Sequence, residues 1–354
     1  MRIGIPKEIK ILEGRVALIP AAAAELVHHG HEVFIQQSAG ELSGYSDTDY
    51  RAAGVTLLPD ARALYNSCEM VVKVKEPQPE EFALLRPDHV LFSYLHLAAE
   101  LDLLKALKEI GLTAVAFETV ETASGQLPLL APMSDIAGRL SAQIGAQLLQ
   151  RPNGGKGLLL GGLPAARRGK VVILGAGVAG GNAAMMAAGM GANVTVFDRN
   201  RDKLERMRAI GANVTALYAY RHEIQQAVAQ ADLLIGAILV TGERAPHLVD
   251  AAMVKSMQAG SVIIDISVDQ GGCIETTRPT NYHEPTFVWE GVVHFGVTNM
   301  PGAVPRSASE ALSAALINYV LQLAQPDWQQ QRDLAAGINV QGGQIVHHAL
   351  QNLV

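Results

Sequence analysis

The sequence predicts an α/β protein with two Rossmann-like domains, each built around a parallel sheet. Its 354 residues, of which 49% are hydrophobic, supply two cores of roughly 150 residues each rather than one. Short apolar runs alternate with helical stretches along almost the whole chain, which is typical of parallel sheets flanked by helices. A glycine-rich turn also lies between one apolar run and a segment of small residues, in the pattern of a dinucleotide site.

The first third of the chain alternates strand and helix candidates. The predicted strands are residues 3–6, 32–36, 70–75, 90–95 and 114–118. The predicted helices between them include residues 21–29 and 100–110.

A second series of strand candidates begins after residue 170. It comprises residues 171–174, 194–197, 214–217, 233–236, 262–265 and 293–297. A series of this kind matches the two mononucleotide-binding halves of a dinucleotide-binding domain.

The strongest motif in this series is the turn that opens with Gly175, continues with Gly177, Val178 and Ala179, and closes with Gly180. It directly follows the apolar run VVIL and directly precedes a small-residue segment predicted to be helical. Glycine at these positions permits the tight turn, the approach of a pyrophosphate to the backbone, and close packing of helix on strand. The alternative is a glycine-rich turn with no ligand.

Asp198 strengthens the interpretation, because it ends the next strand candidate at the spacing expected for a ribose-binding carboxylate. A carboxylate there repels a 2′-phosphate, so NAD is favoured over NADP. The basic residues Arg199, Arg201 and Lys203 leave the NADP alternative open. Lys203 fits either a contact on the adenosine side or a solvated helix charge.

Composition excludes several other classes. A formal net charge of −6 argues against a nucleic-acid partner. The two cysteines, Cys68 and Cys273, form no CxxC pair, so we expect neither a disulfide scaffold nor a metal site. So few cysteines also fit a reducing compartment, and we expect a cytoplasmic location. The start of the chain does not read as a signal peptide. Residues 171–197 carry no charged side chain and are numerous enough to span a membrane. Their glycines, however, favour a strand, a turn and a helix over a membrane span.

Polar candidates follow strands in both predicted domains. Lys75 and His96 lie at the carboxyl ends of strands in the first, and Asp269 and Asn299 follow strands in the second. Because ligands bind at that edge of a parallel sheet, these positions indicate a cleft between the domains. Taken singly, a solvated lysine and a core histidine are the more common interpretations.

Several motifs together resemble alanine dehydrogenases, over nearly the whole chain. They are RIGIPKEIKILEGRVALIPAAAAELVHHGHEV, KVKEPQ, YLHLA, LPLLAPMSDIAGRLSAQIGA, GAGVAG, DISVDQGG and TNMPGAVP. The resemblance implies a discontinuous substrate domain with an inserted NAD domain: residues 1–130, then 131–300 for NAD, then 301–354 with a returning helix at 308–324. It also implies a homohexamer. Nicotinamide transhydrogenases share part of the pattern.

The resemblance assigns roles to the polar candidates. It implies that Arg15 and Lys75 hold the carboxylate of L-alanine, so that Cα–H faces the nicotinamide of NAD. His96 and Asp269 become the acid and base that move protons while the iminium is hydrolysed to pyruvate and ammonium. Which of the two serves each step stays open.

The resemblance also implies a set of cofactor contacts, many of them made through the backbone. Beyond the glycine turn and Asp198, these are Ser134, Lys203, Leu239, Val240, Ile266, Ser267, Val268, Asp269, Arg278, Thr298, Asn299, Met300 and Pro301. One position departs from the family: a serine is common near the end of the third NAD-domain strand, where this chain has Ala219 or Tyr220. An adenine-side hydrogen bond is therefore in doubt.

Two other functions stay open. One is a related nicotinamide enzyme, acting on another small amino acid or exchanging hydride between cofactors as a soluble transhydrogenase-like subunit. The other is a regulator that binds NAD without turnover.

Overall fold

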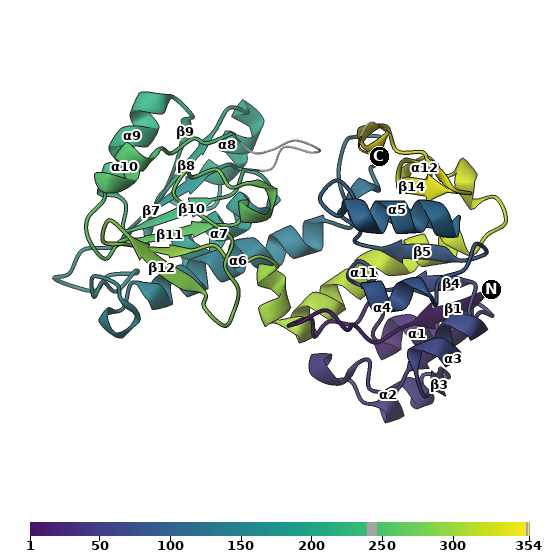
Figure 1. The fold of residues 1–354 in the computed structure, drawn as a ribbon. Helices are drawn as coiled ribbons and strands as arrows, with labels where there is room; N and C mark the ends of the chain where they lie inside the picture. The colour runs from purple at the N-terminus through teal and green to yellow at the C-terminus, as the bar shows by residue number, and fades with distance from the viewer. Residues whose placement is uncertain (239–245, 352, 354) are drawn as a thin grey trace. The chain divides into compact units, whose positions relative to one another are not determined.

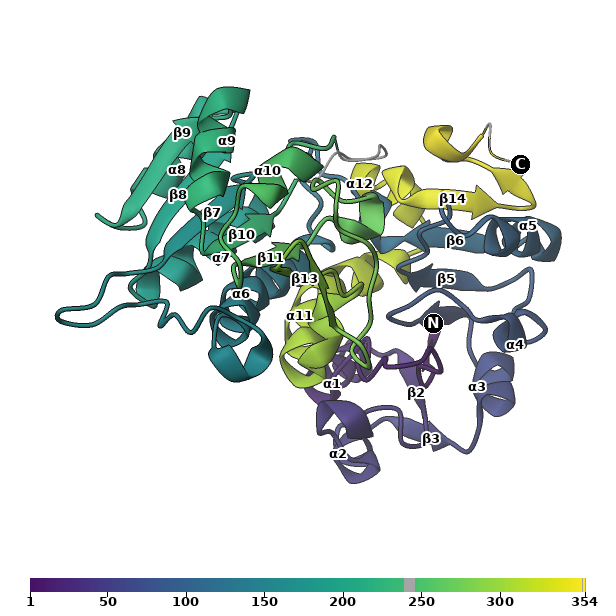
Figure 2. The same ribbon diagram turned by 60° about the vertical axis from the view of Figure 1, so that its left-hand side comes forward.

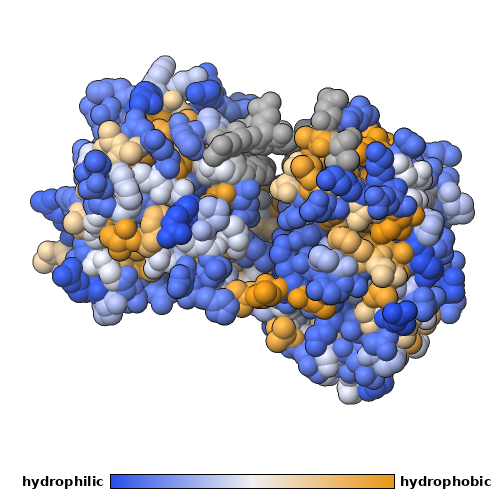
Figure 3. Space-filling view, viewed as in Figure 1, coloured by the Kyte–Doolittle hydropathy of each residue, from blue (hydrophilic) through white to orange (hydrophobic). Residues whose placement is uncertain are grey.

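The computed structural model describes residues 1–238, 246–351 and 353, which form two compact units. Unit 1 comprises residues 1–133 and 302–354, and unit 2 comprises residues 134–301. Both ends of the chain therefore contribute to unit 1. The visible face of each unit is mainly hydrophilic, with hydrophobic residues in small groups (Figure 3).

Unit 1 contains a sheet whose order in the described residues is β15-β14-β6-β5-β4-β1-β2-β3 (Figure 2). Its strands are β1 (Arg2–Ile5), β2 (Glu32–Gln36), β3 (Thr56–Leu58), β4 (Met70–Val72), β5 (Val90–Ser93), β6 (Thr113–Ala116), β14 (Ile338–Gln341) and β15 (Gln344–Ile345). The strands from β3 to β6 pair in parallel, whereas β14 pairs antiparallel with β6 and with β15. The parallel part thus has the 3-2-1-4-5-6 order of a doubly wound fold, whose order reverses between β1 and β4.

Helices flank this sheet (Figure 1). They are α1 (Pro20–His28), α2 (Asp47–Ala52), α3 (Ala61–Ser67), α4 (Pro79–Phe82), α5 (Leu101–Ile110), α11 (Pro305–Leu323) and α12 (Arg332–Ala336), with 3-10 turns η1 (Glu41–Ser43), η2 (Phe117–Thr119), η6 (Trp328–Gln330) and η7 (His348–Leu350). α5 buries Leu103, Leu104 and Leu107 in a core that also contains Leu91 and Ala114 from the strands.

Unit 2 has a second doubly wound sheet, with the order β12-β13-β11-β10-β7-β8-β9 in its described residues (Figure 2). The strands are β7 (Lys170–Leu174), β8 (Asn193–Asp198), β9 (Val214–Tyr218), β10 (Leu233–Gly236), β11 (Val262–Asp265), β12 (Thr286–Trp289) and β13 (Val292–Phe295). All pair in parallel except the edge strand β12. Here the strand order reverses between β7 and β10.

The helices of unit 2 connect these strands. They are α6 (Ala131–Leu148), which begins at the end of unit 1, α7 (Val178–Gly189), α8 (Arg201–Arg208), α9 (Arg221–Gln230) and α10 (Ala251–Lys255), with 3-10 turns η3 (Arg151–Asn153), η4 (Val268–Gln270) and η5 (Met300–Ala303). The uncharged stretch of residues 171–197 forms β7, α7 and most of β8. In the described part of the chain, no helix is long and apolar enough to span a bilayer.

The predicted α/β class is confirmed, with corrections to single strands. The predicted strands 70–75, 90–95 and 114–118 end early, at Val72, Ser93 and Ala116. Four strands, β3, β12, β14 and β15, are not among the predicted ones. Because β12, β14 and β15 pair antiparallel, both sheets carry antiparallel edge strands that were not expected.

Candidate active site

Arg15 lies in the loop between β1 and α1 and is 2% exposed. Two serines of the returning helix α11 hold the loop around it. The backbone N–H of Val16 donates to Ser309 Oγ at 2.9 Å, and that of Ile19 donates to Ser313 Oγ at 2.8 Å. The carboxyl-terminal segment therefore fixes the backbone that carries Arg15.

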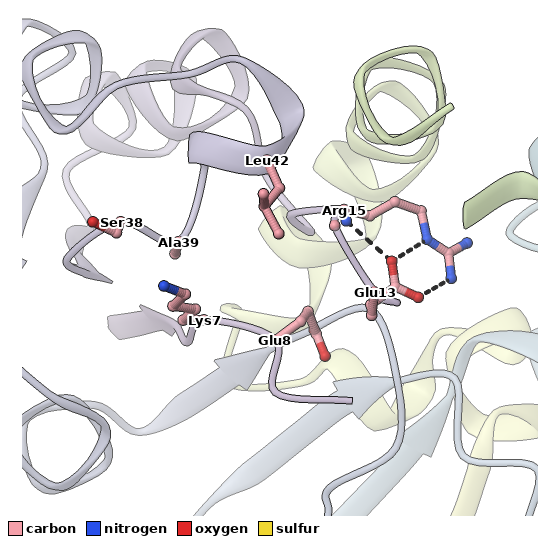
Figure 4. Close-up of a pocket in the computed structure, with 8 residues that line it drawn as sticks. Lys7, Glu8, Glu13, Arg15, Ser38, Ala39 and Leu42 are labelled. Atoms are coloured by element: carbon pink, nitrogen blue, oxygen red, sulfur yellow. Dashed lines mark hydrogen bonds and ion pairs between the residues drawn. The ribbon is translucent and has the colours of Figure 1, made fainter. Parts of the chain in front are cut away.

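The guanidinium of Arg15 is paired with Glu13 (Figure 4). Nε donates to Oε1 at 2.7 Å, Nη2 donates to Oε2 at 2.5 Å, and the Arg15 backbone N–H donates to Oε1 at 3.0 Å. Burial raises the pKa of the Glu13 carboxyl, but the hydrogen bonds and charge of Arg15 outweigh it, and the net pKa is lowered. Glu13 is therefore held as a carboxylate. It is not among the predicted site residues.

Lys75 lies just beyond β4, in a loop rich in charge. Its Nζ is 3.9 Å from Glu76 Oε2, and Glu76 also pairs with Lys10. Burial lowers the pKa of the Lys75 ammonium, and the positive charges of Arg15 and Lys10 lower it further against the opposing effect of Glu76. Lys75 is thus a largely buried cation whose charge interacts with that of Arg15.

A second missed carboxylate, Glu8, joins the ends of β1 and β4 where the strand order reverses. Its Oε1 accepts the backbone N–H groups of Val74 at 2.5 Å and Lys75 at 3.4 Å, and its Oε2 lies 3.6 Å from Lys73 Nζ. From the described residues, Oε2 accepts no hydrogen bond. Lys73 in turn donates to Glu81 Oε2 at 2.8 Å. Two buried carboxylates therefore hold the loop that leads to Lys75.

A small pocket in unit 1 lies beside these groups (Figure 4). It is lined by Lys7, Glu8, Glu13, Gly14, Arg15, Ser38, Ala39 and Leu42. Among the residues predicted for the substrate, Arg15 lines this pocket, and Lys75 is the neighbour of Glu8 through the backbone hydrogen bond described above. The lining of the pocket thus includes Arg15 and two acidic residues, Glu8 and Glu13.

His96 lies beyond β5, with its side chain 45% exposed and its backbone at φ 49°. Glu118 holds this turn, because its Oε1 accepts the His96 backbone N–H at 2.6 Å and lies 3.9 Å from Nδ1. The imidazole stacks on Tyr94 with the ring centroids 5.9 Å apart, and Tyr94 is buried and donates to Leu129 O at 2.6 Å. A left-handed backbone at an exposed histidine is the kind of strain that functional sites retain.

In unit 2, the glycine turn lies where the strand order reverses, between β7 and α7. Gly175 has φ 100°, and a Cβ there would lie 2.4 Å from Ala237 O. A Cβ on Gly180 would lie 1.8 Å from Gly175 O, whereas a Cβ on Gly177 would meet no described atom within 4 Å. The turn is therefore closed on its protein side and open above Gly177 at the start of α7. A dinucleotide pyrophosphate fits this arrangement.

Asp198 ends β8 and supports the same turn. Its Oδ2 accepts the Ala176 backbone N–H at 2.7 Å, and its Oδ1 accepts that of Asn200 at 2.8 Å. The carboxylate is half-buried beside the turn, where the ribose of a bound dinucleotide is expected. Lys203 is also half-buried, in the first turn of α8.

The loop that carries Asp269 is organised by the fully buried Asp265 at the end of β11. The Asp265 carboxylate accepts from the backbone of Ser267 at 3.0 Å and of Cys273 at 3.0 Å, and from Thr277 Oγ1 at 2.8 Å. Asp269 itself is exposed on η4. Asp265, which the sequence analysis counted only as a strand end, therefore sets the path of residues 266–269.

The other predicted cofactor residues lie at several places in unit 2. Ser134 and Thr298 are half-buried, Arg278 is exposed with its guanidinium 4.5 Å from the ring centroid of Phe287, and Asn299 has φ 58°. Met300 and Pro301 are buried in η5, and Ile266, Ser267 and Val268 follow β11. Leu239 and Val240 lie outside the described residues. At the position that departs from the family, Tyr220 is 63% exposed.

Profiles of known families match both parts of the chain. The profile described as alanine dehydrogenase/PNT, N-terminal domain, matches residues 4–137, and that of the corresponding C-terminal domain matches residues 141–348. An alanine dehydrogenase from Halomonas elongata is 46% identical over 355 residues, covering 99% of this chain and 96% of that protein.

Solved structures show the same relationship. An L-alanine dehydrogenase superposes with a TM-score of 0.96 at 52% identity, covering 100% of this chain and 99% of the other. A transhydrogenase from Sinorhizobium meliloti superposes with a TM-score of 0.85 at 25% identity, covering 99% and 100%. The likeness thus extends over the full length of both proteins.

Proposed function

The chain belongs to the alanine dehydrogenase/PNT family, and from this premise we propose that it catalyses the NAD-dependent oxidative deamination of L-alanine to pyruvate and ammonium, and the reverse reductive amination. One observation carries the choice within the family. Over the full chain, identity is 52% to a solved L-alanine dehydrogenase and 25% to a solved transhydrogenase.

Arg15 and Lys75 are the proposed ligands of the substrate carboxylate. Both are largely buried cations, and Arg15 is fixed by its fork to Glu13. A substrate carboxylate that binds a fixed guanidinium gains charge-assisted hydrogen bonds without first ordering the side chain. An amino acid held in this way keeps its Cα–H in one orientation, which hydride transfer requires.

His96 and Asp269 are the proposed proton carriers. A bound NAD would supply the hydride acceptor for the Cα–H of alanine. Once the alanine amino group has lost a proton, departure of the hydride leaves its nitrogen in an iminium. Water then adds to the iminium carbon with loss of a proton, and the carbinolamine expels ammonia as the carbonyl of pyruvate forms. An imidazole and a carboxylate suit these transfers, since each can accept a proton from water and return it to the leaving amine.

The cofactor groups of unit 2 support NAD over NADP. The open space above Gly177 suits a pyrophosphate, and the N–H groups that begin α7 would donate to its oxygens. Asp198 would accept from the ribose hydroxyls and repel a 2′-phosphate. The resemblance extends the proposal to a homohexamer in the cytoplasm, which sedimentation of the purified chain and localisation of a tagged copy would test.

A transhydrogenase-like exchange of hydride between two nicotinamide cofactors is the second candidate, favoured by the TM-score of 0.85. A protein that binds two dinucleotides gains nothing from a carboxylate clamp. Loss of Arg15 should therefore abolish alanine turnover but spare exchange between cofactors.

A single assay separates these functions. The chain is mixed with NAD and, one at a time, a panel of free L-amino acids, while NADH absorbance is followed. NADH formation that depends on alanine supports the proposal, and exchange between cofactors without it supports the second candidate. NADH binding without either activity indicates a regulator and contradicts both.

A further inference from the structure

We propose that Glu13 is a positioning residue, which holds the Arg15 guanidinium in one place and one plane before the substrate carboxylate arrives. The inference rests on the proposed function, since it concerns the group assigned to the substrate carboxylate.

The geometry of the pair is that of a lock on one edge of the guanidinium. Both Nε and Nη2 of Arg15 donate to Glu13, one to each carboxylate oxygen, and the Arg15 backbone N–H donates to Oε1 as well. Side-chain exposure is 2% for Arg15 and 1% for Glu13. A fork of two parallel hydrogen bonds fixes the plane of a guanidinium as well as its position.

One further contact of the guanidinium is weak. Nη1 donates to the Met133 sulfur at 3.0 Å, and a thioether is a poor acceptor. A substrate carboxylate that replaced this sulfur would exchange a weak hydrogen bond for a charge-assisted one without disturbing the fork to Glu13.

The charge of Glu13 has a second consequence for the site. A buried arginine without a counter-ion is strongly unfavourable, and such a side chain tends to move toward water or toward another carboxylate. Glu8 lines the same pocket and, when it is ionised, would compete with Glu13 for the guanidinium. By pairing with Arg15, Glu13 keeps the guanidinium in one place before substrate arrives, which is preorganisation.

The chain offers a matched control for this pair. Asp88 accepts from Nε and Nη2 of Arg86, both at 3.0 Å, so it makes the same two-bond fork over the same separation of two residues. The Asp88 side chain is 63% exposed, and this pair does not line the pocket. Asp88→Asn therefore removes an equivalent interaction without touching the proposed site.

The test measures binding of pyruvate to the NADH complex of the full-length protein, by calorimetry and without ammonium. For Glu13→Gln we expect the pyruvate Kd to rise about tenfold or more, because substrate must then order Arg15 itself. The NADH Kd of the variant should stay within about twofold of the wild-type value, whereas a general loss of structure would weaken NADH binding as well. Asp88→Asn should change neither constant.

Two further variants keep the test decisive if Glu13→Gln does not fold. Glu13→Asp retains the charge but is one methylene too short for both hydrogen bonds, so its pyruvate Kd should lie between those of Glu13→Gln and the wild type. In an Arg15→Gln background, Glu13→Gln should cause no further loss, because a positioning residue acts only through its partner. An unchanged pyruvate Kd in Glu13→Asp, or an additive loss in the double variant, overturns the proposal.

Failure of this inference is distinguishable from failure of the proposed function. If the wild type forms NADH from alanine but Glu13→Gln binds pyruvate normally, only the positioning role is wrong. If the wild type does not turn alanine over, yet its pyruvate affinity depends on Glu13, the function is wrong and the positioning role stands. If the wild type binds no pyruvate, both are wrong.

Discussion

Glu118 Oε1 lies 2.6 Å from the backbone nitrogen of His96 and 3.9 Å from its Nδ1, so one carboxylate holds the backbone of the proposed proton carrier and lies beside its ring. Glu118 also accepts the backbone N–H of Leu95 at 3.2 Å. Because His96 has φ 49°, a conformation that non-glycine residues seldom adopt, these contacts maintain a turn that would otherwise relax.

Glu118→Ala should therefore lower kcat by about a hundredfold, which is the effect expected when a catalytic group is displaced by about an ångström. The NADH Kd should change little, since NADH is assigned to unit 2. Steady-state kinetics and NADH fluorescence titration measure the two quantities. Glu121→Ala, at an exposed nearby carboxylate, is the control and should behave as wild type. An undiminished kcat in Glu118→Ala would show that the turn holds His96 without Glu118.

The glycine turn permits a test that separates fold from ligand. A Cβ at Gly177 meets no described atom within 4 Å, so Gly177→Ala should keep the wild-type melting temperature yet weaken NADH binding by about tenfold or more, because the methyl group occupies the space assigned to the pyrophosphate. Calorimetric melting and NADH titration check this prediction.

Two other glycines serve as controls for Gly177→Ala. Gly189, at the end of α7, also has open space around its Cβ position, so Gly189→Ala should affect neither property adversely. Gly180→Ala should lower the melting temperature, since its Cβ would lie 1.8 Å from Gly175 O. Normal NADH affinity in Gly177→Ala would place the pyrophosphate elsewhere.

Most strands of the two sheets could be predicted because they are short, apolar and largely buried. β2, β10 and β11 begin and end at the predicted residues. The missed strands lack that signal: β3 and β12 are half-exposed edge strands of three or four residues. β14 joins β6 from the far end of the chain, and no local pattern indicates which sheet a returning segment will join. The predicted strand 70–75 ends at Val72, and the backbone N–H groups of Val74 and Lys75 beyond it donate to Glu8.

The sequence motifs of the site could be predicted, but the residues that position the motif residues could not. The spacing of Gly175, Gly177 and Gly180 predicts a turn that the structure contains, and the residue roles themselves remain predictions. Glu13 lies in an irregular loop whose path depends on Ser309, 293 residues away from Val16. Such a partnership arises only when the chain folds, so neither periodicity nor spacing could reveal it.

Cofactor choice is tested at Asp198. Asp198→Ala removes the carboxylate that is proposed to repel a 2′-phosphate, so the ratio of the NADPH Kd to the NADH Kd should fall by about tenfold or more. The variant should also bind NADH more weakly, since Asp198 accepts the Ala176 N–H of the glycine turn. Asp202→Asn, at an exposed acid on α8, controls for local charge. If the ratio of the two constants does not move, the preference for NAD lies in other residues.

Glu8 provides a pH-dependent contribution to stability. Burial of its side chain raises the pKa of Glu8 from 4.5 to about 7, and repulsion by Glu13 and Glu81 raises it too, whereas Lys73 and the hydrogen bond from the Val74 N–H oppose the rise. The folded protein therefore binds a proton at Glu8 that the unfolded chain releases near pH 4.5. Stability from this group is complete below pH 4.5 and is lost as the pH rises through about 7.

Glu8→Gln should remove this dependence, because a neutral amide takes the place of the protonated acid. Relative to the variant, the free energy of unfolding of the wild type should fall by roughly 3 kcal/mol between pH 4.5 and pH 8. Urea denaturation of both proteins at several pH values gives the difference between their free energies of unfolding. Groups that titrate in the same way in both proteins do not contribute to this difference. Glu80→Gln, at an exposed acid on α4, should show no such trend relative to wild type. Parallel curves for the wild type and Glu8→Gln would mean that Glu8 stays ionised when buried, held by Lys73.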